Sequence, residues 1–240
     1  MVFFHGFENC VVNVVGATDT ACTPDGIVRD ALHLAEQLDA ARVNALLVAP
    51  ELRFDLATGD PGMLTTPGRL REMLHELLTE QLDPLLGCEL DVDDFERIAI
   101  VSHSGGYQAT AAVLTTGGVP VREVALFDSL YGEMATFDEW VRGQASRFDR
   151  ARDDDLRWVN IYTGGGGTFD NSRAMASSVA LGLSDAQMSG SLFDDDTIAP
   201  LSREDMAHAV VFKLTDAAHR DVPKLFFRAV VEASGFLPLR

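Results

Sequence analysis

Short apolar runs alternate along the chain with longer segments whose apolar residues recur every three or four positions. The apolar runs are typical of strands covered on both faces, and they occupy residues 1–5, 43–50, 97–103, 121–128, 156–163 and 209–216. The longer segments predict helices over residues 26–41, 68–86, 107–116, 137–148, 171–183 and 222–234. Regular alternation of strands and helices indicates an α/β fold.

The last helical segment shows most clearly how these helices pack. Its apolar residues follow the spacing of one buried helix face, and they are Val222, Leu225, Phe226, Ala229, Val230 and Ala233. We therefore expect a mostly parallel sheet of about six or more strands with helices on both faces. We also expect a single domain over residues 1–240. No element is predicted within residues 6–25, 50–66, 163–170 and 184–208.

Composition excludes several classes of partner. The chain has 240 residues, 47% of them hydrophobic, which is enough for one sizeable core. Its net charge of −18 argues against nucleic acid and anionic membranes, because phosphate groups would be repelled. No apolar run reaches the roughly 18 residues of a membrane span, and no signal peptide precedes the first run. We expect a soluble protein, either cytoplasmic or secreted after removal of a leader.

Metal and cofactor motifs are lacking. The three cysteines, Cys10, Cys22 and Cys88, match no zinc spacing, although Cys10 and Cys22 could pair if the protein is exported. The acidic residues 193–197 lack the alternating ligands of a calcium loop. The four glycines at 164–167 have no phosphate-binding frame around them. We therefore expect no cofactor and no metal.

Residues 101–110, VSHSGGYQAT, form the most informative stretch. An apolar run precedes Ser104 and an Ala-rich helical segment follows it, so a strand meets a helix at this serine. Such a sharp turn needs small neighbours, and Ser102, Gly105 and Gly106 supply them,. This pattern favours a nucleophilic serine. A Gly-rich turn without chemistry is the alternative, since such turns are common in α/β proteins.

A nucleophilic serine needs a histidine to take its proton and a carboxylate to orient that histidine. Asp128 ends the run at 121–128, and His219 lies between the last apolar run and the last helix. The order Ser104, Asp128, His219 and its placement at strand ends resemble the α/β-hydrolase superfamily, with serine esterases and lipases among its members. The resemblance covers most of the chain. Its elbow departs from G-x-S-x-G, because Ser102 replaces the first glycine.

The resemblance implies roles for further residues. FFHGF at 3–7 resembles the HG motif that shapes the family's oxyanion hole, which implies that the N–H of Phe7, or that of Gly6, serves with the N–H of Gly105. His5 then supports this loop by hydrogen bonding. Ser104 would attack an acyl carbon, His219 would move the proton to the leaving group, and water would release the acyl-enzyme.

The acid has two candidates. In most relatives it follows the next strand along, where this sequence offers Asp170. Placement after the preceding strand is a known variant of the family, and Asp128 lies directly at that strand end. We favour Asp128, because Asp170 precedes a helical stretch and is more economically interpreted as its N-cap.

The residues expected around Ser104 are mostly apolar, which favours esters over charged peptides. The predicted substrate-pocket residues are His103, Tyr107, Leu52, Phe54, Leu130 and Tyr131, with Phe7 beside them. No insertion is long enough for a large cap domain, so the substrate is expected to be a small-molecule or polymeric ester. The alternatives are an amidase or peptidase of the same fold, and a catalytically silent binding protein. The oligomeric state has no signal in the sequence.

Overall fold

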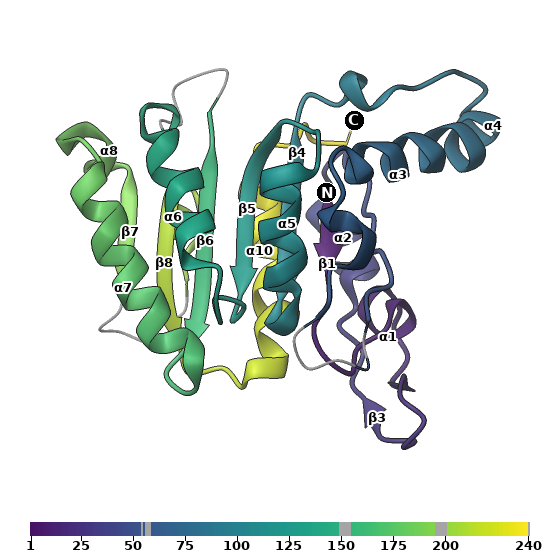
Figure 1. Cartoon of the computed structure of the whole chain (residues 1–240), viewed down its shortest axis with the longest axis horizontal. Coiled ribbons are helices and arrows are strands. Elements are labelled where there is room, and N and C mark those ends of the chain that lie inside the picture. Colours follow the sequence, from purple (N-terminus) through teal and green to yellow (C-terminus); the bar gives the residue numbers. More distant parts are fainter. Residues whose placement is uncertain (54, 56–58, 149–154, 195–200, 240) are drawn as a thin grey trace.

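A parallel sheet of six strands forms the centre of the protein, and the computed structural model describes residues 1–53, 55, 59–148, 155–194 and 201–239. The strand order is β1-β4-β5-β6-β8-β7, and every neighbouring pair is parallel. The strands are β1 (Val2–Phe4), β4 (Ile98–His103), β5 (Val121–Phe127), β6 (Arg157–Thr163), β7 (Ser191–Asp194) and β8 (Val210–Thr215). All carboxyl ends therefore meet at one edge of the sheet, the lower edge in Figure 1.

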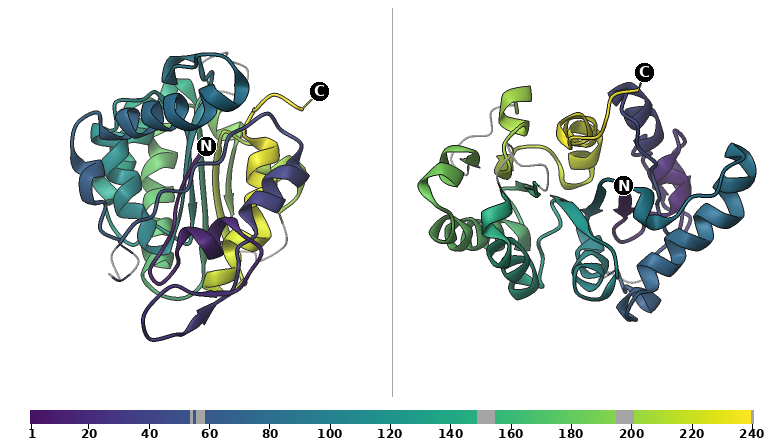
Figure 2. Two further views of the ribbon diagram at one scale, coloured as in Figure 1. Left: turned by 90° about the vertical axis from the view of Figure 1, so that its right-hand side faces the viewer. Right: turned by 90° about the horizontal axis from the view of Figure 1, so that it is seen from above.

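Helices cover both faces of this sheet, as the view from above in Figure 2 shows. One face is covered by α5 (Tyr107–Thr116), α6 (Met134–Gly143) and α7 (Gly167–Gly182). The other face is covered by α10 (Val222–Ala233) and α2 (Leu34–Ala41). Strands between two helical layers need apolar residues on both sides, and β4 is buried along its whole length. The predicted α/β fold with a mostly parallel sheet is confirmed.

The remaining helices are short or lie at the margins of the sheet. They are α1 (Val11–Val15), α3 (Arg69–Leu77), α4 (Asp83–Leu86), α8 (Asp185–Ser189) and α9 (Arg203–Met206). A π-helical turn, Leu78–Leu82, joins α3 to α4. Leu70 and Leu74 of α3 pack on a core cluster that includes Val2 and Phe4 of β1, so this long helical segment covers the β1 margin of the sheet.

The observed elements differ from the prediction in several parts of the chain. The run at 43–50 is no strand; only Val48 pairs with β1, through hydrogen bonds to Met1 and Phe3. The helix predicted over 26–41 begins only at Leu34, because Val28–Arg29 (β3) pairs antiparallel with Thr20–Ala21 (β2). The stretch at 184–208 contains β7, whose four residues are too short to give an apolar period,.

The connections at the carboxyl edge are brief. Only residues 128–133 separate β5 from α6, and only residues 164–166 separate β6 from α7. Neither connection leaves room for a large cap, in agreement with the sequence. No helix among the described residues combines the length and apolar character that crossing a bilayer requires.

Candidate active site

Ser104 lies at a strained turn at the carboxyl end of β4. Its φ is +53°, a left-handed conformation that costs free energy for a residue with a side chain. A 3-10 turn, Ser104–Gly106, then leads directly into α5. A Cβ on Gly106 would lie 2.3 Å from the Phe4 carbonyl oxygen, and one on Gly6 would lie 2.5 Å from the Ser104 Cβ. The turn therefore holds the Ser104 side chain against the loop after β1, and this close contact is possible only because residues 6 and 106 are glycines.

Ser102 contributes a hydroxyl as well as small size. Its Oγ lies 2.9 Å from the Oγ of Ser129, and Ser129 donates a hydrogen bond of 2.8 Å to the carbonyl oxygen of Ser104. Because the Ser129 proton is used in that bond, Ser102 is the donor to Ser129. Both hydroxyl-bearing side chains are fully buried. Ser129 was not identified from the sequence, since a serine one position beyond a strand end carries no distinctive signal.

Asp128 and His219 meet at the same edge of the sheet. The Nδ1 of His219 lies 2.6 Å from the Oδ2 of Asp128, although 91 positions separate them in the chain. Asp128 is 1% exposed, whereas the side chain of His219 is 40% exposed. Within the described residues, the Oγ of Ser104 makes no hydrogen bond to His219. The Nδ1 edge of the imidazole is thus anchored while the ring stays partly exposed.

Four hydrogen bonds hold the Asp128 carboxylate. Its Oδ1 accepts from the backbone N–H of Thr163 at 3.1 Å and from the hydroxyl of Thr168. Its Oδ2 accepts from the Thr163 hydroxyl at 2.9 Å and from His219. Burial alone would raise the pKa of Asp128, but the hydrogen bonds from His219, Thr168 and Thr163 outweigh it and lower the pKa below its usual range,. Asp128 is therefore held as a carboxylate.

Asp170 lies elsewhere. It is exposed in the first turn of α7, and Asp128 is the carboxylate paired with His219. The predicted N-cap role of Asp170 is wrong, because the helix starts three residues earlier and its N-cap is Gly166. The four-glycine stretch permits this early start, since Gly166 adopts a φ of +77°,.

The predicted pocket residues divide into exposed and buried groups. Tyr131 is 40% exposed, with its ring centroid 6.1 Å from that of His219 and 6.2 Å from that of Tyr107. Burial, and then the charge of Asp128, raise the pKa of Tyr131 to about 12, so its phenol stays protonated. Leu130 packs fully buried in the core beneath α6 and α7. Phe54 lies outside the described residues.

The loop after β1 faces the Ser104 turn. Phe7 is 38% exposed, and its neighbour Glu8, with a φ of +62°, forms an ion pair with Arg29. Gly59 also approaches this turn, so closely that its Cβ would lie 2.4 Å from the Gly105 carbonyl oxygen. Both backbone segments proposed for anion binding, at Phe7 and Gly105, are therefore packed within the same small region.

His5 connects this loop to the segment after Pro50. Its Nδ1 lies 3.0 Å from the Gly6 carbonyl oxygen, and its Nε2 accepts the backbone N–H of Leu52 at 2.9 Å. These two partners require a neutral ring with its proton on Nδ1. Burial lowers the pKa of His5, more than its bond to Gly6 and the nearby Glu51 raise it. The geometry agrees with the supporting role expected for His5, and Leu52 contributes mainly a backbone N–H.

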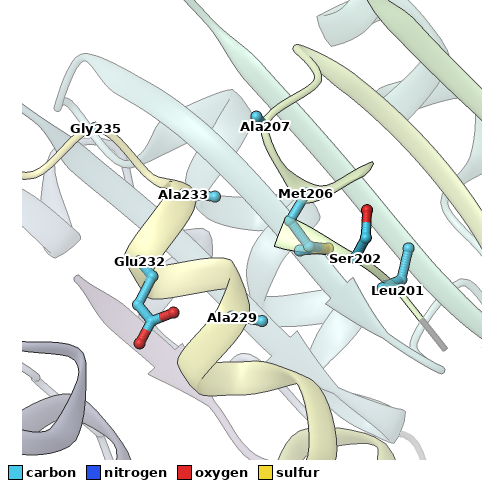
Figure 3. A pocket seen from close by; sticks show the side chains of 8 residues that line it. All are labelled: Leu201, Ser202, Met206, Ala207, Ala229, Glu232, Ala233 and Gly235. Atoms are coloured by element: carbon cyan, nitrogen blue, oxygen red, sulfur yellow. The ribbon is translucent and has the colours of Figure 1, made fainter. Parts of the chain in front are cut away.

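Other features lie apart from this cluster. Cys10 and Cys22 form a disulfide, while Cys88 is exposed and free. No group of His, Cys, Asp or Glu within the described part of the chain could hold a metal ion. A cavity of about 430 Å³ lies between α9 and the end of α10, lined by residues including Met206, Ala229 and Glu232 (Figure 3). It lies at the opposite end of α10 from His219, about 15 Å along the helix.

Comparison with known proteins shows that the chain shares its fold with a solved structure. No protein-family model and no curated protein matches the chain. The structure is similar to that of a serine-to-alanine mutant of the feruloyl esterase module from Clostridium thermocellum, complexed with sinapinate. The TM-score is 0.55 over 99% of this chain and 77% of that chain, at 11% sequence identity. At this identity the likeness shows a shared fold, in agreement with the α/β-hydrolase fold expected from the sequence.

Proposed function

We propose that the protein is a serine hydrolase that cleaves carboxylic esters, with Ser104 as nucleophile, His219 as general base and Asp128 as the acid that orients His219. One observation carries the proposal. A buried carboxylate holds Nδ1 of a half-exposed histidine at 2.6 Å, at the same sheet edge as a serine in a strained strand-to-helix turn. This combination is what nucleophilic activation of a serine requires.

The chemistry follows from these positions. With the Nδ1 proton directed at Asp128, the free Nε2 of His219 can accept the Ser104 proton as Oγ bonds to the acyl carbon. The N–H groups of Phe7 and Gly105 would receive the negative charge on the carbonyl oxygen. His219 then protonates the departing alcohol, whose bond to the acyl carbon breaks. Water, deprotonated by the same histidine, attacks the acyl-enzyme and releases the acid.

Ester substrates are favoured for two reasons. Tyr131 lies beside His219 and Tyr107 beside Tyr131, and both are partly exposed, as is Phe7 in the loop after β1. Such aromatic groups suit an apolar acyl or alcohol group. The similar structure is that of a feruloyl esterase module, so the fold is known to carry ester chemistry. The short connections around the site suit small-molecule and polymeric esters. An amidase would use the same residues, so the substrate test must separate the two reactions.

The test is intact-mass analysis after treatment with a fluorophosphonate. We expect one adduct on the wild type, one on the control variant Ser189→Ala, whose hydroxyl is exposed on α8, and none on Ser104→Ala. A folded wild type without an adduct would favour the catalytically silent alternative. Rates on a matched ester and anilide then decide the reaction class, and faster anilide cleavage would make the protein an amidase or peptidase.

A further inference from the structure

His103 lies beside Ser104 in the chain and beside His219 in space. The ring centroids of His103 and His219 are 4.7 Å apart, with the planes inclined by 31°. The Nε2 of His103 lies 3.0 Å from the carbonyl oxygen of His219, and a carbonyl can only accept, so Nε2 is the donor. His103 is 2% exposed, which makes it part of the protein interior and removes it from direct contact with a ligand.

We infer that His103 is a positioning residue: its Nε2–H fixes the backbone of His219, and its ring supports one face of the His219 imidazole. This inference rests on the proposed function. It gives His103 a role other than the pocket lining expected from the sequence. The residue before the nucleophile thereby links β4 directly to the loop that carries the base.

The need for such a link is visible around His219. This residue opens a 3-10 turn, His219–Asp221, and its side chain is 40% exposed. Its side chain has one hydrogen bond among the described residues, to Asp128. A single bond fixes the position of Nδ1 but leaves the ring free to swing about that contact. The hydrogen bond from His103 to the His219 backbone, together with contact between the two rings, restricts that motion.

The protonation state of His103 suits this role. Because Nε2 carries a proton, Nδ1 of a neutral ring is bare, and it is buried without a hydrogen-bond partner in the described part of the chain. Burial first, and then the charge of His219, lower the pKa of His103 to about 3. The ring is therefore neutral when His219 becomes an imidazolium. A neutral aromatic face attracts a cation, whereas a second cation would repel it.

Several other ionisable groups lie near His219. Asp128 accepts from Nδ1, and Tyr131 approaches edge-on. Arg220 and Asp221 follow His219 within its own turn. None of these is changed by substitution of His103. A difference between His103 variants can thus be attributed to the contact between the two histidines.

The experiment compares His103→Gln with His103→Asn. Both are amides, but only the glutamine side chain is long enough to place its N–H near the position of the imidazole Nε2. We expect the asparagine variant to lose about 10-fold to 100-fold in kcat with little change in KM, because a base displaced by about 1 Å is costly. The glutamine variant should recover most of that loss. Thermal unfolding of both variants measures any difference in stability.

A third variant separates the ring from the hydrogen bond. His103→Phe retains an aromatic face and lacks the donor, so we expect its kcat to lie between those of the asparagine and glutamine variants. A glutamine variant as slow as the asparagine variant, or an asparagine variant within about twofold of wild type, would overturn the inference. Fluorophosphonate labelling distinguishes the two possible failures. An unlabelled wild type refutes the proposed function, whereas a labelled wild type with equal glutamine and asparagine variants refutes only the role of His103.

Discussion

The two sides of the candidate site are built in different ways. On the base side, Asp128 and His219 are held by strand ends and by hydroxyl groups from β6 and α7. On the oxyanion side, the backbone around Gly6 and Phe7 belongs to a loop that depends on His5 and on Leu52, which is 47 positions away. The base side is fixed by pairing between strands, whereas the oxyanion side depends in addition on contact between two loops.

The parallel sheet explains this difference. His103 pairs with Phe127, and Phe127 pairs with Ile161, so Ser104, Asp128 and the β6 end must lie close together once the register is set. Pairing of Phe4 with Ser102 also brings Gly6 to the Ser104 turn, but among the described residues no strand pairing places Leu52 in the same manner. The position of a loop depends on specific side-chain hydrogen bonds. We therefore expect substitutions on the two sides to reduce kcat by different amounts and for different reasons.

The largest effect is expected for Asp128→Asn. The amide keeps the size of the carboxylate but offers His219 the wrong hydrogen-bonding partner, which favours the unproductive tautomer. We expect kcat to fall by about 10⁴-fold, as tautomer loss does in other triads, with KM changed little. Steady-state ester hydrolysis measures the loss.

The matched control is Asp170→Asn, which removes an exposed carboxylate from the first turn of α7. We expect near-normal turnover from this variant. The reverse result, a large loss of turnover for Asp170→Asn and a small one for Asp128→Asn, would assign the acid to Asp170. It would refute the role of Asp128 in orienting His219.

A smaller effect is expected for His5→Phe on the oxyanion side. Phenylalanine fills the buried space but leaves the Leu52 N–H and the Gly6 carbonyl oxygen without their bonds. Because the donors for the oxyanion would move without being deleted, we expect kcat to fall by about 10-fold to 100-fold, less than removal of one donor costs in full. The pH dependence of kcat should stay as in the wild type, because Asp128 and His219 are untouched.

His75→Phe provides the control, since His75 is exposed on α3. If His5→Phe had the same kcat and the same KM for an ester as the wild type, the loop after β1 would have no part in transition-state stabilisation. The difference between the two sides would then be a feature of the fold without consequence for catalysis.

The sequence predicts the base side better than the oxyanion side, for the same physical reason. Ser104, Asp128 and His219 follow apolar runs that are visible in the sequence, and parallel strands bring their carboxyl ends together. The bond between His5 and Leu52 joins two loops, and no period in the sequence encodes it. Ser129 and Thr168 were missed because a single hydroxyl near a strand end has no distinctive pattern.

The fold shows the same limit. The sheet and the large helices follow from apolar periodicity, whereas β7 is a four-residue edge strand and 43–50 contributes two isolated bridges, of which one joins β1. Short elements such as these are decided by tertiary packing, which outweighs local propensity.

The last prediction concerns acid stability, because each side of the site contains one buried neutral histidine: His103 on the base side and His5 on the oxyanion side. The pKa of His103 is lowered from its ordinary value of 6.5 to about 3, and that of His5 is lowered as well. Between pH 6.5 and 3 the unfolded chain therefore binds more protons than the folded chain, so the free energy of unfolding falls as the pH falls.

For His103 alone, the loss between pH 7 and pH 5 is about 2 kcal/mol. Acidification also reduces repulsion among the excess carboxylates, which give the chain its net charge of −18, but that effect is common to the wild type and to the variants. The informative quantity is therefore the difference in urea unfolding between pH 7 and pH 5 for the wild type, His103→Gln and His5→Gln. Each glutamine variant should lose less stability than the wild type over this interval. Equal losses in all three proteins would mean that neither histidine is held neutral by the fold, and a smaller loss in one variant alone would show that only the histidine replaced in that variant is held neutral.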